Sequence, residues 1–225
     1  MNSLNAITDM LEMQSALNDM TNGPDWRTGK TALGKIIDWR RCIVMETAEL
    51  IDSYPWKHWK SVDAKTDMEN VRVELVDIWH FLLSLALENF NQEEAADLLS
   101  QAYQSNQNQN LEDLSANVQL SIHETMMAKA LIKTQVTDSY LLALTSAFFK
   151  SCLVAELSFE NLYQIYMAKN VLNKFRQDHG YKEGSYLKDW NGKEDNVVMF
   201  EIIEQMAEFS GDELYTNLKR IYSTL

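Results

Sequence analysis

IIDWRRCIVMETAELI (residues 36–51) and VRVELVDIWHFLLSLAL (residues 71–87) are apolar segments, and each is interrupted by two carboxylates three residues apart. The first pair is Glu46 and Glu49, and the second is Glu74 and Asp77. Residues three apart on a helix lie on the same face, about 6 Å from each other. We therefore predict two helices, within residues 36–53 and 68–90, that each present a pair of carboxylates beside apolar side chains.

These four carboxylates are the candidate metal ligands of the chain. Carboxylates gathered near a core repel one another and lose hydration, which costs several kcal/mol unless a cation compensates them. Neither segment supplies a matching buried lysine or arginine. Hard oxygen ligands in this number favour Mg²⁺, with Mn²⁺ as a second option, and Mg²⁺ commonly completes its shell with water and substrate phosphate. The alternative is that the four are solvated charges on amphipathic helices.

Length and composition predict an all-α protein. The 225 residues include only two prolines and seven glycines, so we expect long helices, in one large domain or in one domain with an insertion. The net charge of −13 argues against nucleic acid and anionic membrane surfaces as partners, but it allows a phosphorylated substrate bound through metal ions. No apolar run reaches the roughly 20 residues of a membrane span, and no leader pattern opens the chain. We therefore expect a soluble, cytoplasmic protein.

The chain has two cysteines, Cys42 and Cys152. Two cysteines in apolar surroundings are too few for a disulfide framework or a zinc site. They favour a reducing compartment, although a bridge between them stays open at this point.

Residues 3–20 are predicted to form the first helix. Its apolar stripe continues into Gln14 and Asn18, where apolar residues would be expected. An amide offers both a donor and an acceptor, so these two side chains can recognise the edge of a base inside a pocket. The alternative is that this end of the helix is simply exposed to water.

The connection DSYPWKHWKSVDAKTD (residues 52–67) separates the two acidic helices. Between Glu49 and Glu74 lie 24 residues, enough for the chain to turn and return antiparallel, which would bring the second carboxylate pair against the first. Of Trp56 and Trp59, we expect one to anchor the core and one to offer a flat surface on which a ring can stack.

Asp77 and His80 form an Asp-x-x-His pattern, which makes His80 a candidate metal ligand. Di-iron bundles need Glu-x-x-His on each of two helices, and the first acidic helix has no such histidine. We therefore favour an oxygen-only metal site and expect His80 to be packed in the core or to support the ligands from behind. A di-iron centre is the less favoured alternative.

Residues 91–110 become polar and end in an Asn/Gln run, which is typical of a linker. Residues 111–134 and 138–157 are predicted as two further helices. Because nothing in 91–157 carries chemistry, we predict an inserted helical subdomain over 91–157 and a catalytic core made of 1–90 and 158–225.

From residue 158 a predicted helix places Lys169, Asn173 and Arg176 on one face. Between Lys169 and Lys193 there are six basic residues and three acidic ones, which reverses the charge of the rest of the chain. Lysine and arginine on one face suit phosphate oxygens. The alternative to phosphate binding is that the lysines after this helix lie in an ordinary exposed basic loop. The tail, 196–225, is predicted as one or two amphipathic helices used for packing or self-association.

Together these motifs resemble a known family. The sequence is similar to the dimeric all-α dUTP pyrophosphatases, within the wider all-α nucleoside triphosphate pyrophosphohydrolase group. The resemblance rests on Gln14-x-x-x-Asn18, ETAE at 46–49, KHWK at 57–60, ELVDIWHF at 74–81, KNVLNKFRQDHGYKEGSY at 169–186 and WNGKEDN at 190–196. It covers both ends of the chain and leaves 91–157 without a matching motif.

The resemblance implies an Mg²⁺-dependent hydrolase that converts dUTP, and also dUDP, to dUMP as a homodimer. It implies Glu46, Glu49, Glu74 and Asp77 as metal ligands. Gln14 and Asn18 would contact uracil with Trp59 nearby, and Phe81 would pack against the deoxyribose. The implied phosphate and sugar clamp comprises Lys169, Asn173, Arg176, Tyr181, Lys182, Lys193 and Asn196.

In such a reaction, metal ions neutralise phosphate charge and lower the pKa of a bound water. Glu49 is the candidate catalytic residue that accepts the proton of this water, while lysine and arginine stabilise charge on the leaving oxygen. Two other functions stay open. One is a pyrophosphohydrolase that prefers another nucleotide such as dCTP, and the other is a helical interaction protein without turnover.

Overall fold

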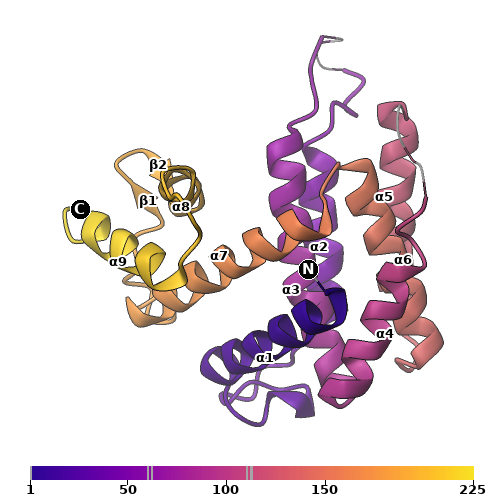
Figure 1. Ribbon diagram of the computed structural model, residues 1–225, viewed down its shortest axis with the longest axis horizontal. Coiled ribbons are helices and arrows are strands. Elements are labelled where there is room, and N and C mark those ends of the chain that lie inside the picture. Colours follow the sequence, from indigo (N-terminus) through magenta and orange to yellow (C-terminus); the bar gives the residue numbers. More distant parts are fainter. Residues whose placement is uncertain (1, 60, 62, 110, 112–113) are drawn as a thin grey trace. The chain divides into compact units, whose positions relative to one another are not determined.

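The computed structural model describes residues 2–59, 61, 63–109, 111 and 114–225. Lys60 of the KHWK motif and Asn110 of the polar run lie outside the described residues. Over the described residues the chain is predominantly α-helical, which confirms the predicted all-α class (Figure 1). The elements are α1 (Ser3–Asn22), the 3-10 helix η1 (Trp26–Thr28), α2 (Trp39–Asp52), α3 (Met68–Asn89), α4 (Gln92–Gln104), α5 (Ala116–Leu131), α6 (Asp138–Val154), α7 (Phe159–Asp178), β1 (Asp189–Trp190), β2 (Lys193–Glu194), α8 (Asp195–Glu204) and α9 (Gly211–Tyr222).

The chain divides into two compact units, Met1–Leu162 and Tyr163–Leu225. Residues 91–157 therefore lie in the same unit as residues 1–90, which differs from the separate insertion predicted from the sequence. The physical reason is that α4 packs on α1 and α6, while α5 packs on α2 and α6. Helices α1–α6 thus contribute to one unit.

The prediction of a linker over residues 91–110 is wrong, because helix α4 occupies most of this range. Asn91 accepts a hydrogen bond from the backbone N–H of Glu94, and the Glu94 carboxylate accepts one from the backbone N–H of Asn91. This capping box satisfies two donors that the start of a helix leaves unpaired. Ala95 and Leu99 are then buried along one side of α4. The pattern Asn-x-x-Glu before an alanine-rich run was the sequence signal for this helix.

Among the described elements, α2 and α3 share the most extensive contact. The backbone N–H of Asp67 donates to the Ser53 carbonyl at 2.9 Å, and Asn70 Nδ2 donates to the Ser53 hydroxyl at 2.8 Å. The end of α2 therefore lies beside the start of α3, as the predicted antiparallel return requires. Asp38 and Asp67 cap the two helices by accepting hydrogen bonds from backbone N–H groups.

Trp79 of α3 connects three helices of the first unit. Its side chain is fully buried, and its ring stacks on Phe148 of α6 with centroids 5.0 Å apart. Its Nε1–H points to the Met10 sulfur of α1 at 3.2 Å. A large aromatic side chain with its one polar atom satisfied is well suited to such a junction.

Cys42 and Cys152 are both free thiols, so the bridge that the sequence left open is not present. Within the part of the chain that the structure describes, no single helix has the length and hydropathy of a membrane span, although α6 and α7 pass such a test as a bent pair by length and composition.

The second unit has a core of its own around Phe175 and Trp190. Strands β1 and β2 form a short antiparallel hairpin that pairs Trp190 with Lys193. Asn191 and Gly192 at its turn have φ of 56° and 86°, and positive φ at both positions is the requirement of a two-residue type I′ turn. Helices α8 and α9 confirm that the predicted tail is helical, and they bury Val198, Met199, Leu214 and Leu218.

Acidification is expected to destabilise the first unit through His123 of α5. The side chain is fully buried with its Nε2 3.0 Å from the Tyr54 hydroxyl, and burial lowers its pKa from 6.5 to about 4. The unfolded chain takes up a proton near pH 6.5 and the folded chain does not, so stability present above this pH is lost as the pH falls towards 4. The loss from this histidine is about 2 kcal/mol at pH 5. Urea unfolding at pH 7.5 and pH 5.0 measures it.

Two variants isolate this contribution from that of other titrating groups. His123→Gln is expected to weaken the pH dependence of unfolding, whereas His58→Gln, at an exposed histidine, leaves it unchanged. The same pH dependence in His123→Gln as in the wild type would contradict the assignment.

Candidate metal centre and nucleotide site

Three of the four predicted ligands converge where α2 and α3 pack. Glu46 comes from α2, Glu74 and Asp77 come from α3, and one ligand oxygen of each lies within 4.8 Å of the others. The spacing of three residues aligns the two carboxylates of α3, and the packing of α2 against α3 brings the third to them. This acidic triad, Glu46, Glu74 and Asp77, can hold a metal ion.

The carboxylates of the acidic triad disfavour one another's charge. Burial and then the neighbouring negative charges, Asp77 first, raise the pKa of Glu46 to about 8. A carboxyl with this pKa is largely protonated at neutral pH unless a cation lies beside it. Three carboxylates from two helices form an oxygen donor set of the kind that Mg²⁺ and Mn²⁺ prefer. The residues therefore fit a hard divalent cation.

Glu49, the fourth predicted ligand, lies outside the acidic triad. Its side chain is exposed, and its negative charge still acts on Glu46 one turn earlier in α2. Of the four predicted ligands, three therefore form a close group among the described residues, and Glu49 is not part of it. Because it is exposed, the Glu49 carboxylate is in contact with water.

The two predicted base-reading amides lie in a buried hydrogen-bond network. Gln14 and Asn18 are 3% and 2% exposed, so the alternative of a wet helix end is wrong. Gln14 Nε2 donates to Asn18 Oδ1 at 3.1 Å, and Asn18 Nδ2 donates to Ser84 Oγ at 3.0 Å. His80 Nδ1 lies 2.7 Å from Gln14 Oε1, so His80 is packed as expected. Ser84 was not singled out in the sequence, because one serine within a leucine-rich run forms no motif.

Neither tryptophan of the connection anchors the core, which corrects the prediction for Trp56 and Trp59. They are 42% and 63% exposed, and their rings meet edge to face with centroids 5.6 Å apart. Loops run over protein surfaces, so their aromatic rings contact water unless a ligand or a partner covers them. Phe81, the predicted deoxyribose contact, is partly buried and stacks on Trp39 with centroids 6.2 Å apart.

In the second unit, three predicted clamp residues of α7 and one of α8 form a hydrogen-bonded group. Arg176 Nη1 donates to Asn173 Oδ1 at 3.0 Å, and Lys169 Nζ donates to Asn196 Oδ1 at 3.3 Å. Spacings of four and three residues align the first three on α7. The structure thus brings Lys169, Asn173, Arg176 and Asn196 together.

Asp195 belongs to the same group and was missed by the sequence analysis. Its carboxylate is fully buried and accepts two hydrogen bonds from Arg176, at 2.7 Å from Nε and 2.8 Å from Nη2. The Tyr186 hydroxyl donates a third at 2.8 Å. Burial alone would raise the pKa of Asp195, but the hydrogen bonds and charge of Arg176 lower it. Nothing in the sequence KEDN distinguishes this buried aspartate from its exposed neighbour Glu194.

The remaining predicted clamp residues are exposed. Tyr181 is exposed although the Arg176 guanidinium lies 6.0 Å from its ring centroid, and Lys193 forms a surface ion pair with Glu201. Lys182 is exposed as well. Their exposure fits the basic loop that the sequence left as an alternative.

Comparison with known families supplies the assignment. A family model described as dUTPase matches residues 6–181. The chain belongs to the dUTPase family. The matched range includes the acidic triad, both amides and the clamp residues of α7, whereas Asp195 and Asn196 follow it. As a dUTPase, the protein is an enzyme of the dUTP diphosphatase class. A search of curated proteins gave no match.

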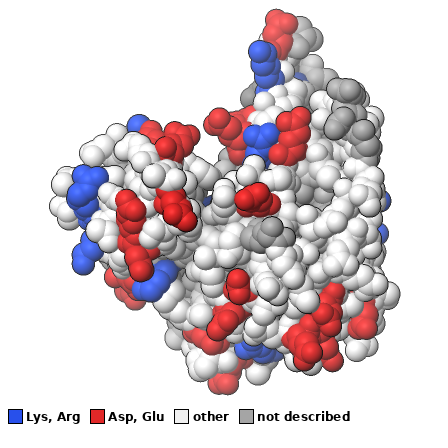
Figure 2. Space-filling model, in the orientation of Figure 1, with Lys and Arg blue, Asp and Glu red and all other residues white. Residues whose placement is uncertain are grey.

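Acidic residues outnumber basic residues in this dUTPase, 33 to 20. Figure 2 shows aspartate and glutamate spread over the visible face, with lysine and arginine in fewer places, in agreement with the net charge of −13. Such a surface repels the phosphates of a nucleotide, so the substrate depends on positive charge gathered at its site.

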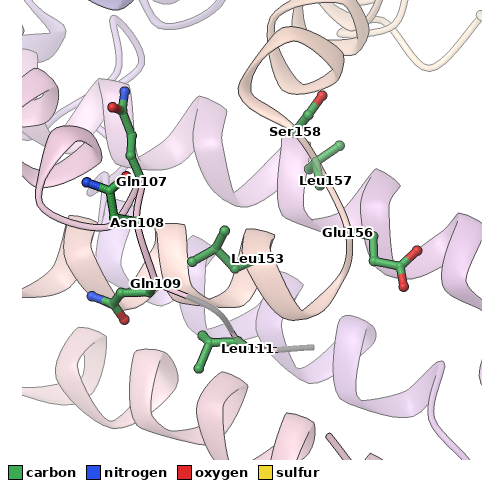
Figure 3. A pocket seen from close by; sticks show the side chains of 8 residues that line it. All are labelled: Gln107, Asn108, Gln109, Leu111, Leu153, Glu156, Leu157 and Ser158. Carbon is green, nitrogen blue, oxygen red and sulfur yellow. The ribbon is translucent and has the colours of Figure 1, made fainter. Parts of the chain in front are cut away.

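The first unit of this dUTPase also has a cavity of about 480 Å³ lined by other residues. Leu153 at the end of α6 and Leu157 after it lie on one side, and the segment after α4 that carries Gln107, Asn108 and Gln109 lies on the other (Figure 3). The lining comprises Gln107, Asn108, Gln109, Leu111, Leu153, Glu156, Leu157 and Ser158. None of the predicted site residues is among them, so this cavity does not explain nucleotide binding.

Proposed function

We propose that this dUTPase hydrolyses dUTP, and also dUDP, in an Mg²⁺-dependent reaction in which a water attacks the phosphate chain and releases dUMP with pyrophosphate or phosphate. The observation that carries the proposal is the acidic triad, whose ligand oxygens lie within 4.8 Å of one another on two packed helices of a dUTPase chain. Such a group of oxygens matches the ions that accompany nucleotide phosphates in enzymes.

Glu46, Glu74 and Asp77 would hold the ion, and the nearby carboxylate of Glu49 is available as a further ligand. Bound Mg²⁺, or Mn²⁺ in its place, supplies neutralisation of phosphate charge and a water of lowered pKa.

Glu49 is the proposed catalytic base. Its carboxylate is exposed to water and close enough to the acidic triad to act electrostatically on Glu46. A base must reach both the attacking water and solvent, where the proton is finally released. Glu49 meets the second requirement, which the buried Glu74 does not.

Recognition of the nucleoside is proposed for the first unit. Gln14 and Asn18 would meet the uracil edge, the exposed ring of Trp59 would cover the base, and Phe81 would pack against the deoxyribose. The small exposed fraction of both amides leaves only a narrow part of each for a base to contact.

Phosphate binding is proposed for residues of α7 and of the start of α8. Lys169 and Arg176 supply the positive charge, and Asn173 and Asn196 orient them through hydrogen bonds. Asn196 is also the proposed contact to the 3′-hydroxyl. Tyr181, Lys182 and Lys193 are exposed side chains that would complete the clamp when a nucleotide arrives.

Purified protein with Mg²⁺ is expected to release dUMP from dUTP and from dUDP, and EDTA is expected to abolish the release. Chromatographic measurement of nucleoside monophosphates from dUTP, dUDP, dCTP and dTTP, with and without EDTA, tests both the ion and the base. Glu49→Ala should lack turnover, while Glu12→Ala, at an exposed glutamate of α1, should match the wild type. Faster turnover of dCTP than of dUTP, or full activity in EDTA, would refute the proposal.

A homodimer in the cytoplasm is also proposed. It follows from the resemblance to dimeric all-α enzymes and from the composition of the chain. Light scattering coupled to gel filtration tests the dimer, with a mass of two chains of 26.0 kDa expected.

A further inference from the structure

Four polar side chains form a continuous buried hydrogen-bond chain between α1 and α3. Gln14 and Asn18 of α1 face His80 and Ser84 of α3, and all four are more than nine-tenths buried. The two members from α3 have no place in the acidic triad. Buried polar side chains are costly unless they satisfy one another, so an arrangement of four polar groups in a core needs an explanation.

One backbone carbonyl sets which side chains of this hydrogen-bond chain donate and which accept. The Ser84 hydroxyl donates to the carbonyl oxygen of His80 at 2.9 Å, and a carbonyl can only accept. With its proton used there, Ser84 Oγ accepts from Asn18 Nδ2 at 3.0 Å. Asn18 Oδ1, at 3.4 Å, is a second and longer acceptor for the Ser84 proton, and a hydrogen bond to either acceptor agrees with Asn18 Oδ1 as an acceptor and Nδ2 as a donor.

The orientation then passes from Asn18 to the histidine. Since Asn18 turns its Nδ2 to Ser84, its Oδ1 faces Gln14 and accepts from Nε2 at 3.1 Å. Gln14 consequently presents Oε1 to His80 at 2.7 Å, and the hydrogen on this contact belongs to His80 Nδ1. Rotating the Gln14 amide by half a turn would set its Oε1 against Asn18 Oδ1, two acceptors, which costs about 1–3 kcal/mol for a buried group.

We propose that His80 and Ser84 are positioning residues that determine nucleobase selectivity by fixing the amide orientations of Gln14 and Asn18. This inference rests on the proposed function, in which these two amides meet the base. Uracil presents a donor at N3 and an acceptor at O4, while cytosine presents an acceptor at N3 and a donor at its 4-amino group. An amide held in one orientation distinguishes these patterns, and an amide free to rotate accepts both.

The test compares kcat/KM for dUTP and dCTP in variants of the Mg²⁺-supplied enzyme. His80→Phe keeps a ring and removes the donor, so the dUTP preference is expected to fall by about 10-fold or more. His80→Asn places an amide N–H near the position of Nδ1 and is expected to retain most of the preference. Ser84→Ala removes the hydroxyl at the other end of the hydrogen-bond chain and leaves the His80 ring in place. It should also lower the preference for dUTP over dCTP.

Matched controls separate this role from a purely structural one. His123→Phe and Ser100→Ala replace buried residues of α5 and α4 that do not belong to this hydrogen-bond chain. They are expected to lower the unfolding temperature while leaving the ratio of kcat/KM values unchanged. A second readout does not depend on activity, because ¹⁵N NMR of the histidine side chains should show His80 in the Nδ1–H tautomer.

The outcomes distinguish the inference from the proposed function. A wild type that prefers dUTP, with unchanged preference in both His80→Phe and Ser84→Ala, would overturn the inference and leave the proposed function intact. An Nε2–H tautomer at His80 would also overturn it. A wild type that hydrolyses dUTP without preferring it to dCTP would overturn the inference alone, whereas a wild type that does not hydrolyse dUTP would reject the proposed function.

Discussion

Replacing Glu74 by glutamine is expected to lower kcat/KM for dUTP by about 1,000-fold, equivalent to about 4 kcal/mol of transition-state stabilisation. Glu74 is the most buried member of the acidic triad, and glutamine keeps its shape while removing the charge that would hold the ion. The neutral amide also removes a repulsion inside the triad. Steady-state kinetics at saturating Mg²⁺ measures the loss.

The same substitution should stabilise the metal-free protein. Removing one carboxylate charge from the crowded triad is expected to raise the unfolding temperature in EDTA by about 2–4 °C for each kcal/mol gained. Glu69→Gln, at an exposed carboxylate in the first turn of α3, is the control. It should leave turnover unchanged and should not raise the unfolding temperature, because a negative charge near a helix N-terminus is stabilising. A Glu74→Gln enzyme with normal activity would mean that the reaction needs no cation at the triad. A variant that is less stable in EDTA than the wild type would mean that the carboxylates of the triad do not repel one another.

Replacing Asp195 by asparagine is expected to weaken both the second unit and turnover. Asp195 accepts two hydrogen bonds from Arg176 and one from Tyr186, and it is completely buried. Breaking a buried ion pair on one side costs about 3–5 kcal/mol, because the remaining charge has no partner. With Arg176 displaced from Asn173, we expect kcat/KM for dUTP to fall by about 10- to 100-fold, since groups that orient a binding residue usually contribute this much.

The neighbouring residue provides the control for this prediction. Glu194→Gln removes a carboxylate that pairs with Lys188 at 3.6 Å on the surface, where both side chains are more than half exposed. Exposed pairs contribute little, so activity and stability should stay near the wild-type values. Chemical denaturation monitored by tryptophan fluorescence, with Trp190 in the core of the second unit, reports the stability of both variants. Similar behaviour of Asp195→Asn and Glu194→Gln would show that Asp195 does not position Arg176.

The features that could be predicted from the sequence are those with a local cause. The spacing between Glu74 and Asp77 aligns them on any helix, and the same holds for Lys169, Asn173 and Arg176 on α7. The all-α class followed from the scarcity of glycine and proline. Even the missed helix α4 had a local signal, because Asn91 and Glu94 form a capping box that the polar composition of the segment obscured.

The features that could not be predicted depend on how helices rotate against each other. Glu49 follows Glu46 by about one helical turn of α2. Of these two, only Glu46 has a ligand oxygen within 4.8 Å of those of Glu74 and Asp77. Which side of α2 meets α3 is decided by the sum of all packing contacts, and no pair of residues reveals it. The burial of Asp195 and the exposure of Trp56 and Trp59 were likewise decided by distant neighbours.

The sequence by itself determined that the chain is helical, that acidic pairs interrupt two apolar helices, and that a basic face follows near the C-terminal end, because each of these depends on residues within a few positions of one another. Only the tertiary structure decided which three carboxylates meet and that His80 and Ser84 face the amides of α1. These contacts join residues up to 66 positions apart. Their formation depends on close packing of side chains across helices, which the periodicity of a single segment does not contain.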